Sequence, residues 1–346
     1  MLKYALPASL LLSVSAFAQT QVVTSIKPVS MIVTAIGGDE VKVEQLVNNQ
    51  ASPHDYAMRP SDLRKLDQAD LVVWVGELLE TFLEKPLANL SSKKDIEWMA
   101  LSGTYLREFG EEGHDHEDHE DHEDHEDHKD HEDHEGHDHE DHDHEGHEDH
   151  DHDEHDHKDH EHEAHDEHGH EGHDHTGTDP HVWLDPANAK ILAHNVMEQL
   201  SKLDPEHKQE FAANYQAFVG ALETADNNVE ATLAPIKDVP YFVFHEAYGY
   251  FEGHYGLNNK GAVTLSPERK PGAKTVANIR TEIEEHNVAC IFSEPQFSPA
   301  IVETLIDGTD VKTAVLDPLG VSLKLSNDSY PAFLEALAGQ YATCLK

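Results

Sequence analysis

The chain has 346 residues, of which 69 are acidic and 24 basic, so its formal charge is −45 with the histidines neutral. Such a polyanion is excluded as a ligand of nucleic-acid phosphates or anionic lipid, because it is repelled by both. Much of the charge is local, since residues 111–175 hold 24 of the 31 histidines, 33 carboxylates, two lysines and one apolar side chain, Ala164. The rest of the chain has an ordinary apolar content, and because one core rarely serves more than about 250 to 300 residues, it predicts two globular lobes with two cores.

The first eighteen residues have the pattern of a secretory signal peptide. Lys3 supplies the charged start, residues 5–17 are mostly apolar, and Ala16-Phe17-Ala18 is a small-x-small cleavage site before Gln19. A membrane anchor is the alternative, but a spanning helix needs about 20 apolar residues. The mature chain is therefore expected to start at Gln19, without direct membrane insertion, in the periplasm.

Strands and helices alternate in the next part of the chain. In chain order we expect a strand at 22–26, a helix from Lys27-Pro28 to Gly37-Gly38, a strand at 41–47, a helix starting at Pro60, a strand at 71–75, a helix at 77–90 and a strand at 96–101. Strand and helix in alternation predict a parallel sheet covered by helices.

A second alternating series follows the acidic tract. Helices are expected at 187–203 and 206–233, the latter with one apolar stripe formed by Phe211, Tyr215, Phe218 and Leu222. After Pro235 and Pro240 we expect strands at 241–244, 289–292 and 311–316 and helices at 275–286, 299–306 and 330–341.

The predicted fold class is α/β, with two parallel-sheet lobes joined by one long rigid helix. The expected boundaries are 19–205 for the first lobe, which carries a disordered insertion at 111–178, then 206–234 for the linking helix and 235–346 for the second lobe.

The chain has two cysteines, Cys290 and Cys344. In an oxidising compartment two cysteines in one lobe are expected to be bridged, with two unpaired buried thiols as the alternative. Such a bridge would pin the C-terminal helix to a strand.

Seven histidines lie outside the tract, and three of them occupy places where a cleft is expected. His54 follows the strand at 41–47, His245 comes directly after the strand at 241–244, and His181 lies in a loop whose two Asp-Pro steps should hold the backbone extended. Each alone is more often a hydrogen-bonded loop histidine. Together they predict a site for zinc, copper or nickel rather than manganese or calcium. The other four are interpreted as solvated surface residues: His194, His207, His254 and His286.

Two carboxylates also lie at strand ends, Glu294 and Asp317. Each could be a fourth metal ligand, an acceptor that orients an imidazole N–H, or a cap of the following helix. No catalytic constellation accompanies them, because Gly249 occupies the last position of a possible H-E-x-x-H and no G-x-S-x-G, P-loop or G-x-G-x-x-G is present. An enzyme is therefore not predicted.

At these residues the chain resembles the metal-binding receptors of ABC importers, in which two α/β lobes are joined by one rigid helix, and most closely the zinc-specific periplasmic ones. The matching stretches are Ser52-Pro53-His54-Asp55-Tyr56 with Arg59-Pro60-Ser61-Asp62, Ala69-Asp70-Leu71-Val72-Val73-Trp74-Val75-Gly76, Pro180-His181-Val182-Trp183-Leu184, Tyr241-Phe242-Val243-Phe244-His245-Glu246-Ala247-Tyr248-Gly249-Tyr250-Phe251, Phe292-Ser293-Glu294-Pro295-Gln296-Phe297 and Leu316-Asp317-Pro318-Leu319-Gly320.

The resemblance implies that His54, His181 and His245 bind Zn²⁺, since manganese members carry a carboxylate at the third position. Some zinc members have Glu immediately before the first histidine, where this chain has Pro53. That departure leaves water, Asp317 or Glu294 for the fourth position. The implied partner is a membrane permease, and a monomer is expected.

The tract itself is predicted to be disordered, because one apolar residue cannot build a core. It is interpreted as a low-affinity zinc collector or sensor, with a solvated linker as the alternative, and it should release zinc below the imidazole pKa of about 6.5. Three functions remain open: a zinc receptor for a permease, a zinc buffer that acts through the tract, and a three-histidine hydrolase with an open water position.

Overall fold

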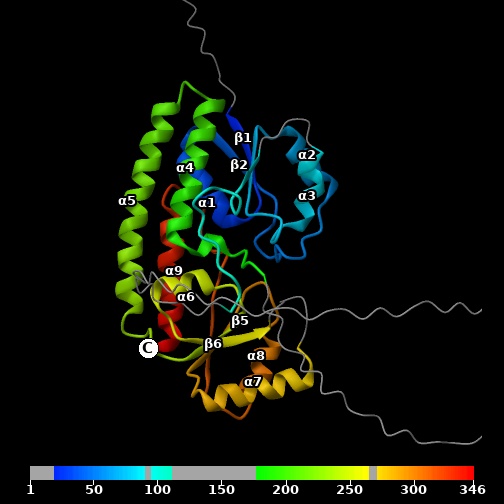
Figure 1. The fold of residues 1–346 in the computed structure, drawn as a ribbon, viewed down its shortest axis with the longest axis vertical. Coiled ribbons are helices and arrows are strands. Elements are labelled where there is room, and N and C mark those ends of the chain that lie inside the picture. The colour runs from blue at the N-terminus through cyan, green and yellow to red at the C-terminus, as the bar shows by residue number, and fades with distance from the viewer. Residues whose placement is uncertain (1–18, 90–94, 111–176, 265–270) are drawn as a thin grey trace, which may run out of the picture. The chain divides into compact units, whose positions relative to one another are not determined.

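The computed structural model describes residues 19–89, 95–110, 177–264 and 271–346 (Figure 1). The expected signal peptide at 1–18 and nearly all of the expected disordered insertion lie outside the described residues.

The first sheet lies in the N-terminal part of the chain. Within the described residues its order is β2-β1-β3-β4 and every pair is parallel. Its strands are β1 (Thr20–Thr24), β2 (Val41–Gln45), β3 (Leu71–Trp74) and β4 (Asp95–Glu97). The helices beside it are α1 (Lys27–Gly37), α2 (Pro60–Gln68) and α3 (Thr81–Ala88), with a 3₁₀ turn, η1 (Gly38–Glu40), after α1.

The second sheet repeats this design with β5 at an interior position. Among the residues described, its order is β6-β5-β7-β8, again parallel throughout. Its strands are β5 (Tyr241–His245), β6 (Asn259–Thr264), β7 (Cys290–Ser293) and β8 (Lys312–Val315). Its helices are α6 (Gly249–Tyr255), α7 (Ala273–Glu285), α8 (Ala300–Ile306) and α9 (Ser329–Leu345). The α/β class with two parallel sheets is confirmed, while α6 and β6 were not predicted.

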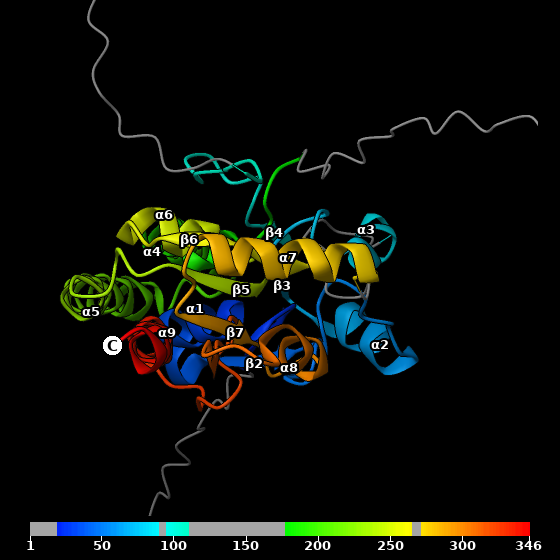
Figure 2. The same cartoon turned by 90° about the horizontal axis from the view of Figure 1, so that it is seen from below.

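A helical layer runs beside both sheets. It contains α4 (Pro186–Leu203) and α5 (Lys208–Leu233), and α5 packs against α1, α4 and α9 (Figures 1 and 2). The long helix buries Phe211, Phe218 and Leu222, three members of the apolar stripe. The lobe boundaries given above remain a prediction.

One buried cluster extends across both sheets, and each sheet also has a cluster of its own, so the two cores that the composition suggested are present beside a shared one. A single cluster of buried apolar side chains includes Val73 of the first sheet, Tyr241 of the second, and Leu337 of α9. Helices make this continuity possible, because α1 contacts β1 and β2, α9 contacts β8, and α1 and α9 contact each other and α5.

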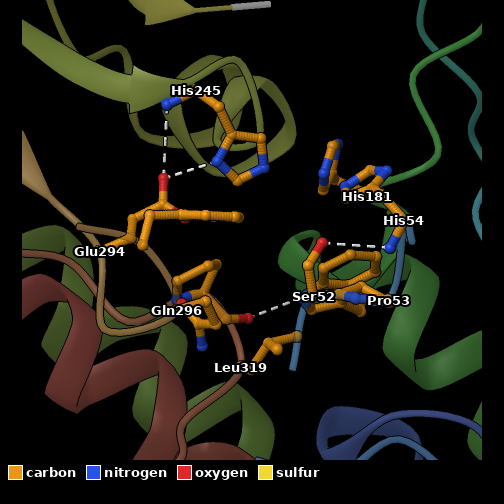
Figure 3. A pocket seen from close by; sticks show the side chains of 11 residues that line it. Ser52, Pro53, His54, His181, His245, Glu294, Gln296 and Leu319 are labelled. Atoms are coloured by element: carbon orange, nitrogen blue, oxygen red, sulfur yellow. Dashed lines mark hydrogen bonds and ion pairs between the residues drawn. The ribbon is translucent and has the colours of Figure 1, made fainter. Parts of the chain in front are cut away.

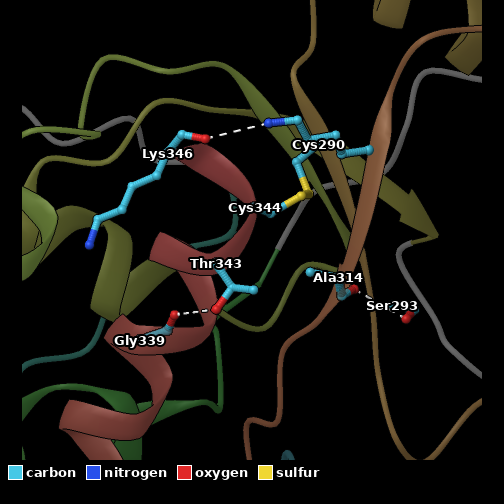
Figure 4. The surroundings of a disulfide bond; sticks show 8 residues. Cys290, Ser293, Ala314, Gly339, Thr343, Cys344 and Lys346 are labelled. Carbon is cyan, nitrogen blue, oxygen red and sulfur yellow. Dashed lines mark hydrogen bonds between the residues drawn. A yellow bond between two sulfur atoms is a disulfide. The ribbon is translucent and has the colours of Figure 1, made fainter.

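A disulfide joins the second sheet to the C-terminal helix. Cys290 of β7 is bonded to Cys344 of α9, and both side chains are buried (Figure 4). The predicted pairing is therefore present. In the part of the chain that the structure describes, no helix combines the length and apolar character needed to cross a membrane.

Candidate metal centre

His54, His181 and His245 lie together although they are far apart in the sequence. His54 is in the loop between β2 and α2, His181 precedes the 3₁₀ turn η2 (Val182–Leu184), and His245 is the last residue of β5. Their ring centroids form a nearly equilateral triangle with sides of 5.3, 5.3 and 5.8 Å (Figure 3). One nitrogen from each lies within 4.8 Å of the others, so the three rings can offer nitrogens to a single metal ion.

His181 is held by a buried carboxylate. Oδ1 of Asp179 lies 2.7 Å from Nδ1 of His181 and also accepts the backbone N–H of His181 at 2.9 Å. A proton fixed on Nδ1 leaves the lone pair on Nε2 for a metal. Nε2 of His181 is indeed buried and has no hydrogen-bond partner. Residues 182–184 form a 3₁₀ turn, so the loop is not extended throughout as expected, and the role of Asp179 was not predicted.

His245 is held in the same way from the second sheet. Oε1 of Glu294, just after β7, lies 2.6 Å from Nδ1 of His245. The second carboxylate oxygen, Oε2, is buried and has no hydrogen-bond partner. Of the three roles that the sequence left open for Glu294, the structure shows the acceptor that orients an imidazole (Figure 3).

His54 completes the triangle from a less buried position. Burial, together with the nearby His181 and His245, holds the pKa of His54 well below its usual value. Metals bind the neutral imidazole, so this ring is in its metal-binding form at neutral pH.

Apolar side chains line the small cavity at the triangle. Pro53, Trp183, Phe297 and Leu319 contribute to its wall, and its volume is ≈ 20 Å³. A cavity of that size suits one ion or one water molecule. Its apolar wall strengthens electrostatic interactions inside it by keeping water away.

Asp317 is engaged in its own loop. Its carboxylate oxygens accept the backbone N–H groups of Leu319 at 3.2 Å and Val321 at 2.7 Å. Burial raises its pKa. Asp317 is not among the residues that line the cavity, so its role as fourth ligand stays a prediction.

A second group of possible ligands, Glu40, Asp204 and His207, differs from the triangle. Nδ1 of His207 lies 2.6 Å from Asp204 and Nε2 lies 3.5 Å from Glu40, so carboxylates face both nitrogens. Hydrogen bonding to Asp204 raises the pKa of His207, which favours a protonated ring between two acids over a metal ligand. His207 is a half-exposed surface residue paired with two acids, and His194, His254 and His286 are exposed, as expected from the sequence.

Comparisons with known proteins give consistent matches over nearly the whole chain. Residues 22–344 match the family described as zinc-uptake complex component A, periplasmic. The chain is 45% identical to the high-affinity zinc uptake system protein ZnuA of Haemophilus influenzae, over 100% of this chain and 98% of the relative. The ZnuA of Yersinia pestis is 38% identical over the same shares of the two chains. A crystal structure of a ZnuA deletion mutant with zinc bound has a TM-score of 0.68, with 22% identity over 95% of this chain and 99% of that one.

These matches decide several of the predictions. The family is periplasmic and consists of zinc-uptake components, not enzymes, so the predicted compartment and class are confirmed and the hydrolase alternative is not supported. The chain therefore belongs to the family of the periplasmic component A of zinc-uptake complexes.

Proposed function

We propose that this protein is a zinc receptor, which binds one Zn²⁺ through His54, His181 and His245 and delivers it to the membrane permease of an ABC importer. The observation that carries the proposal is the triangle of imidazoles, two of them oriented by buried carboxylates. Neutral imidazoles around a position open to a fourth ligand suit tetrahedral Zn²⁺. The names of the relatives, which specify high-affinity zinc uptake, support the same metal.

The fourth ligand is water or Glu294 in preference to Asp317. Glu294 lines the cavity and has an oxygen without a hydrogen-bond partner, whereas both oxygens of Asp317 accept backbone N–H groups. To bind a metal, Asp317 would have to give up these hydrogen bonds to the backbone of its own loop.

The histidine-rich tract is proposed to be a collector or sensor that supplies zinc to this site at low affinity. Its imidazoles lie beside carboxylates in sequence and can each contribute to weak sites. The alternative is a zinc buffer in which the tract is the functional part, and the three-histidine site among the described residues favours the receptor.

Substitution of each histidine tests the site. His54→Ala, His181→Ala and His245→Ala should each lower the affinity of the tight site at least about tenfold, because each removes one of three coordinating nitrogens. Competition titration of the full chain against a zinc chelator of known affinity measures this. His254→Ala is the matched control, since His254 is exposed and contacts Asp226 instead. A histidine that can be replaced without loss does not belong to the site.

Deletion of residues 111–175 separates the receptor from the buffer. The backbone N–H of Phe109 donates to the carbonyl of Gly177 at 3.0 Å, so a short glycine-serine linker can join the two ends. A receptor keeps one tight site that prefers zinc to manganese, whereas a buffer loses nearly all of its zinc binding.

A further inference from the structure

We propose that Arg107 is a positioning residue for the metal centre. It links Asp179, the carboxylate that holds His181, to α6, the helix that follows His245. The inference rests on the proposed function of these two histidines as zinc ligands. It concerns the stem, defined as residues 105–110 and 177–180, the two segments on either side of the histidine-rich insertion.

The stem is a short antiparallel pairing. Glu108 and Thr178 form a β-bridge, and Oγ1 of Thr178 donates to Oε1 of Glu108 at 2.8 Å. The backbone N–H of Asp179 donates to the carbonyl of Arg107 at 2.9 Å. The two ends of the insertion are therefore fastened to each other immediately before His181.

The two carboxylate oxygens of Asp179 have different partners, the guanidinium of Arg107 and the imidazole of His181. Oδ2 lies 3.2 Å from Nη1 of Arg107, while Oδ1 faces Nδ1 of His181 at 2.7 Å. Asp179 is fully buried and Arg107 is only 8% exposed. A buried carboxylate needs such a partner, because an uncompensated charge in the interior is strongly unfavourable. Arg107 thus fixes the orientation in which the Asp179 carboxylate holds the imidazole.

The same guanidinium lies against the second half of the site. A Cβ atom on Gly249, the first residue of α6, would be 1.1 Å from Nη1 of Arg107, so the guanidinium occupies the space that a side chain there would need. The centre of the Tyr250 ring lies 5.9 Å from Cζ of Arg107. The Tyr250 hydroxyl accepts the backbone N–H of Arg107 at 3.1 Å and donates to the carbonyl of Asp179 at 2.8 Å.

These contacts connect two zinc ligands through one residue. α6 begins four positions after His245, and Arg107 touches its first two residues while holding the carboxylate that orients His181. Removing the guanidinium should loosen both histidines relative to each other. Loss of a group that orients a metal ligand typically lowers metal affinity by roughly ten- to a hundredfold.

Four variants of the full-length protein test this. Arg107→Gln removes the charge, and Arg107→Lys restores a cation without the planar fork. Gly249→Ala displaces the guanidinium without changing any charge. Arg280→Gln is the control, because Arg280 binds the backbone carbonyls of Thr304 and Asp307 on the second lobe. Zinc affinity of the tight site is measured by chelator competition, and the Nδ1–H resonance of His181 is followed by NMR and assigned by its disappearance in His181→Ala.

We expect Arg107→Gln and Gly249→Ala each to weaken zinc binding by roughly ten- to a hundredfold and to shift or broaden the His181 resonance. Arg107→Lys should recover part of the affinity, and Arg280→Gln should match the wild type. The Arg107→Gln, Gly249→Ala double variant should be no worse than the single ones, because both remove the same contact. If Arg107→Gln does not fold, the zinc affinity and the His181 resonance of Gly249→Ala and Arg107→Lys test the inference.

Wild-type affinity in Gly249→Ala and Arg107→Lys, with an unchanged His181 resonance, overturns the inference. Wild-type affinity in folded Arg107→Gln does the same. If His181→Ala and His245→Ala themselves keep the tight site, the proposed function fails instead. The two failures are therefore distinguishable.

Discussion

At the scale of single residues, two imidazoles of the candidate metal centre are oriented by carboxylates, and the third is kept neutral by its surroundings. Asp179 and Glu294 each accept a hydrogen bond at Nδ1, of His181 and His245 respectively, which leaves Nε2 as the lone-pair atom. His54 is kept neutral by burial and by the other two rings, which lower its pKa. The site is therefore preformed, with its carboxylates placed to orient imidazoles.

Glu294 and Asp317 should respond differently to isosteric substitution. Glu294→Gln should lower zinc affinity at least about tenfold, because the amide weakens the hold on His245 and removes a charged oxygen beside the metal. Asp317→Asn should change zinc affinity little but destabilise the fold by about 1–3 kcal/mol, because one of two buried N–H groups loses its acceptor. Chelator competition and urea unfolding measure the two effects. A larger affinity loss in Asp317→Asn would identify Asp317 as the fourth ligand.

Glu80 should make stability fall with rising pH. This fully buried residue precedes α3, and Oε2 accepts the backbone N–H groups of Val75 and Gly76. Burial raises the pKa of Glu80 from 4.5 to about 7, so between these pH values the folded state binds more protons than the unfolded state and stability declines. The decline is about 3 kcal/mol. Glu80→Gln should remove it, so that the variant gains stability relative to the wild type between pH 5 and pH 8 in urea unfolding. Parallel pH profiles for the two proteins would contradict this.

At the scale of elements, local sequence was sufficient where it contained clear signals. The helix expected at 27–37 has those bounds, because Pro28 lies in its first turn and Gly38 follows its end with φ 55°. The segment 249–264 was missed because glycine and asparagine interrupt both helical and strand periodicity there. β6 is also only partly buried, so it lacks the apolar run that identified the other strands.

The contact between Arg107 and Asp179 could not be predicted. Arg107 and Asp179 are 72 positions apart and flank a low-complexity tract, so neither motif nor periodicity pairs them. The three histidines were accessible because His54 and His245 follow strands of parallel sheets, where ligand sites are expected, and because the resemblance covered all three.

The disulfide links two of these elements and should contribute to stability by restricting the unfolded chain. Cys290 and Cys344 close a loop with a sequence separation of 54, which is worth about 4 kcal/mol in the chain-entropy model. Urea unfolding with and without the reductant TCEP should show a difference of this order. Zinc affinity of the reduced, folded protein should stay within about threefold, since the bond lies in β7 and α9 and not at the histidines. A difference below about 1 kcal/mol would mean that the bond is dispensable.

At the scale of the whole molecule, the shared core bears on how far the two sheets can move. Side chains from both sheets and from α9 belong to one buried cluster, and α5 packs against helices of both halves. Opening a wide cleft would expose part of that cluster at a cost of about 25 cal/mol per Å². We therefore expect only small closure on zinc binding.

The tract and the metal centre should lose zinc at different pH values. The 24 histidines of 111–175 stand beside carboxylates in a segment with one apolar residue, so near-ordinary pKa values of about 6.5 are expected and their weak sites should vanish together between about pH 7 and 5.5. The metal centre should hold zinc to lower pH, because its imidazoles are fixed by Asp179 and Glu294 and bound metal competes with protons for Nε2. Calorimetry of the full chain at both pH values should show many weak sites reduced to one strong site, and the protein lacking 111–175 should show the strong site alone at both. If the strong site disappears first while the weak ones persist, the tract is the principal zinc-binding element. The proposal of a zinc receptor is then wrong, and the zinc buffer is the better description of the protein.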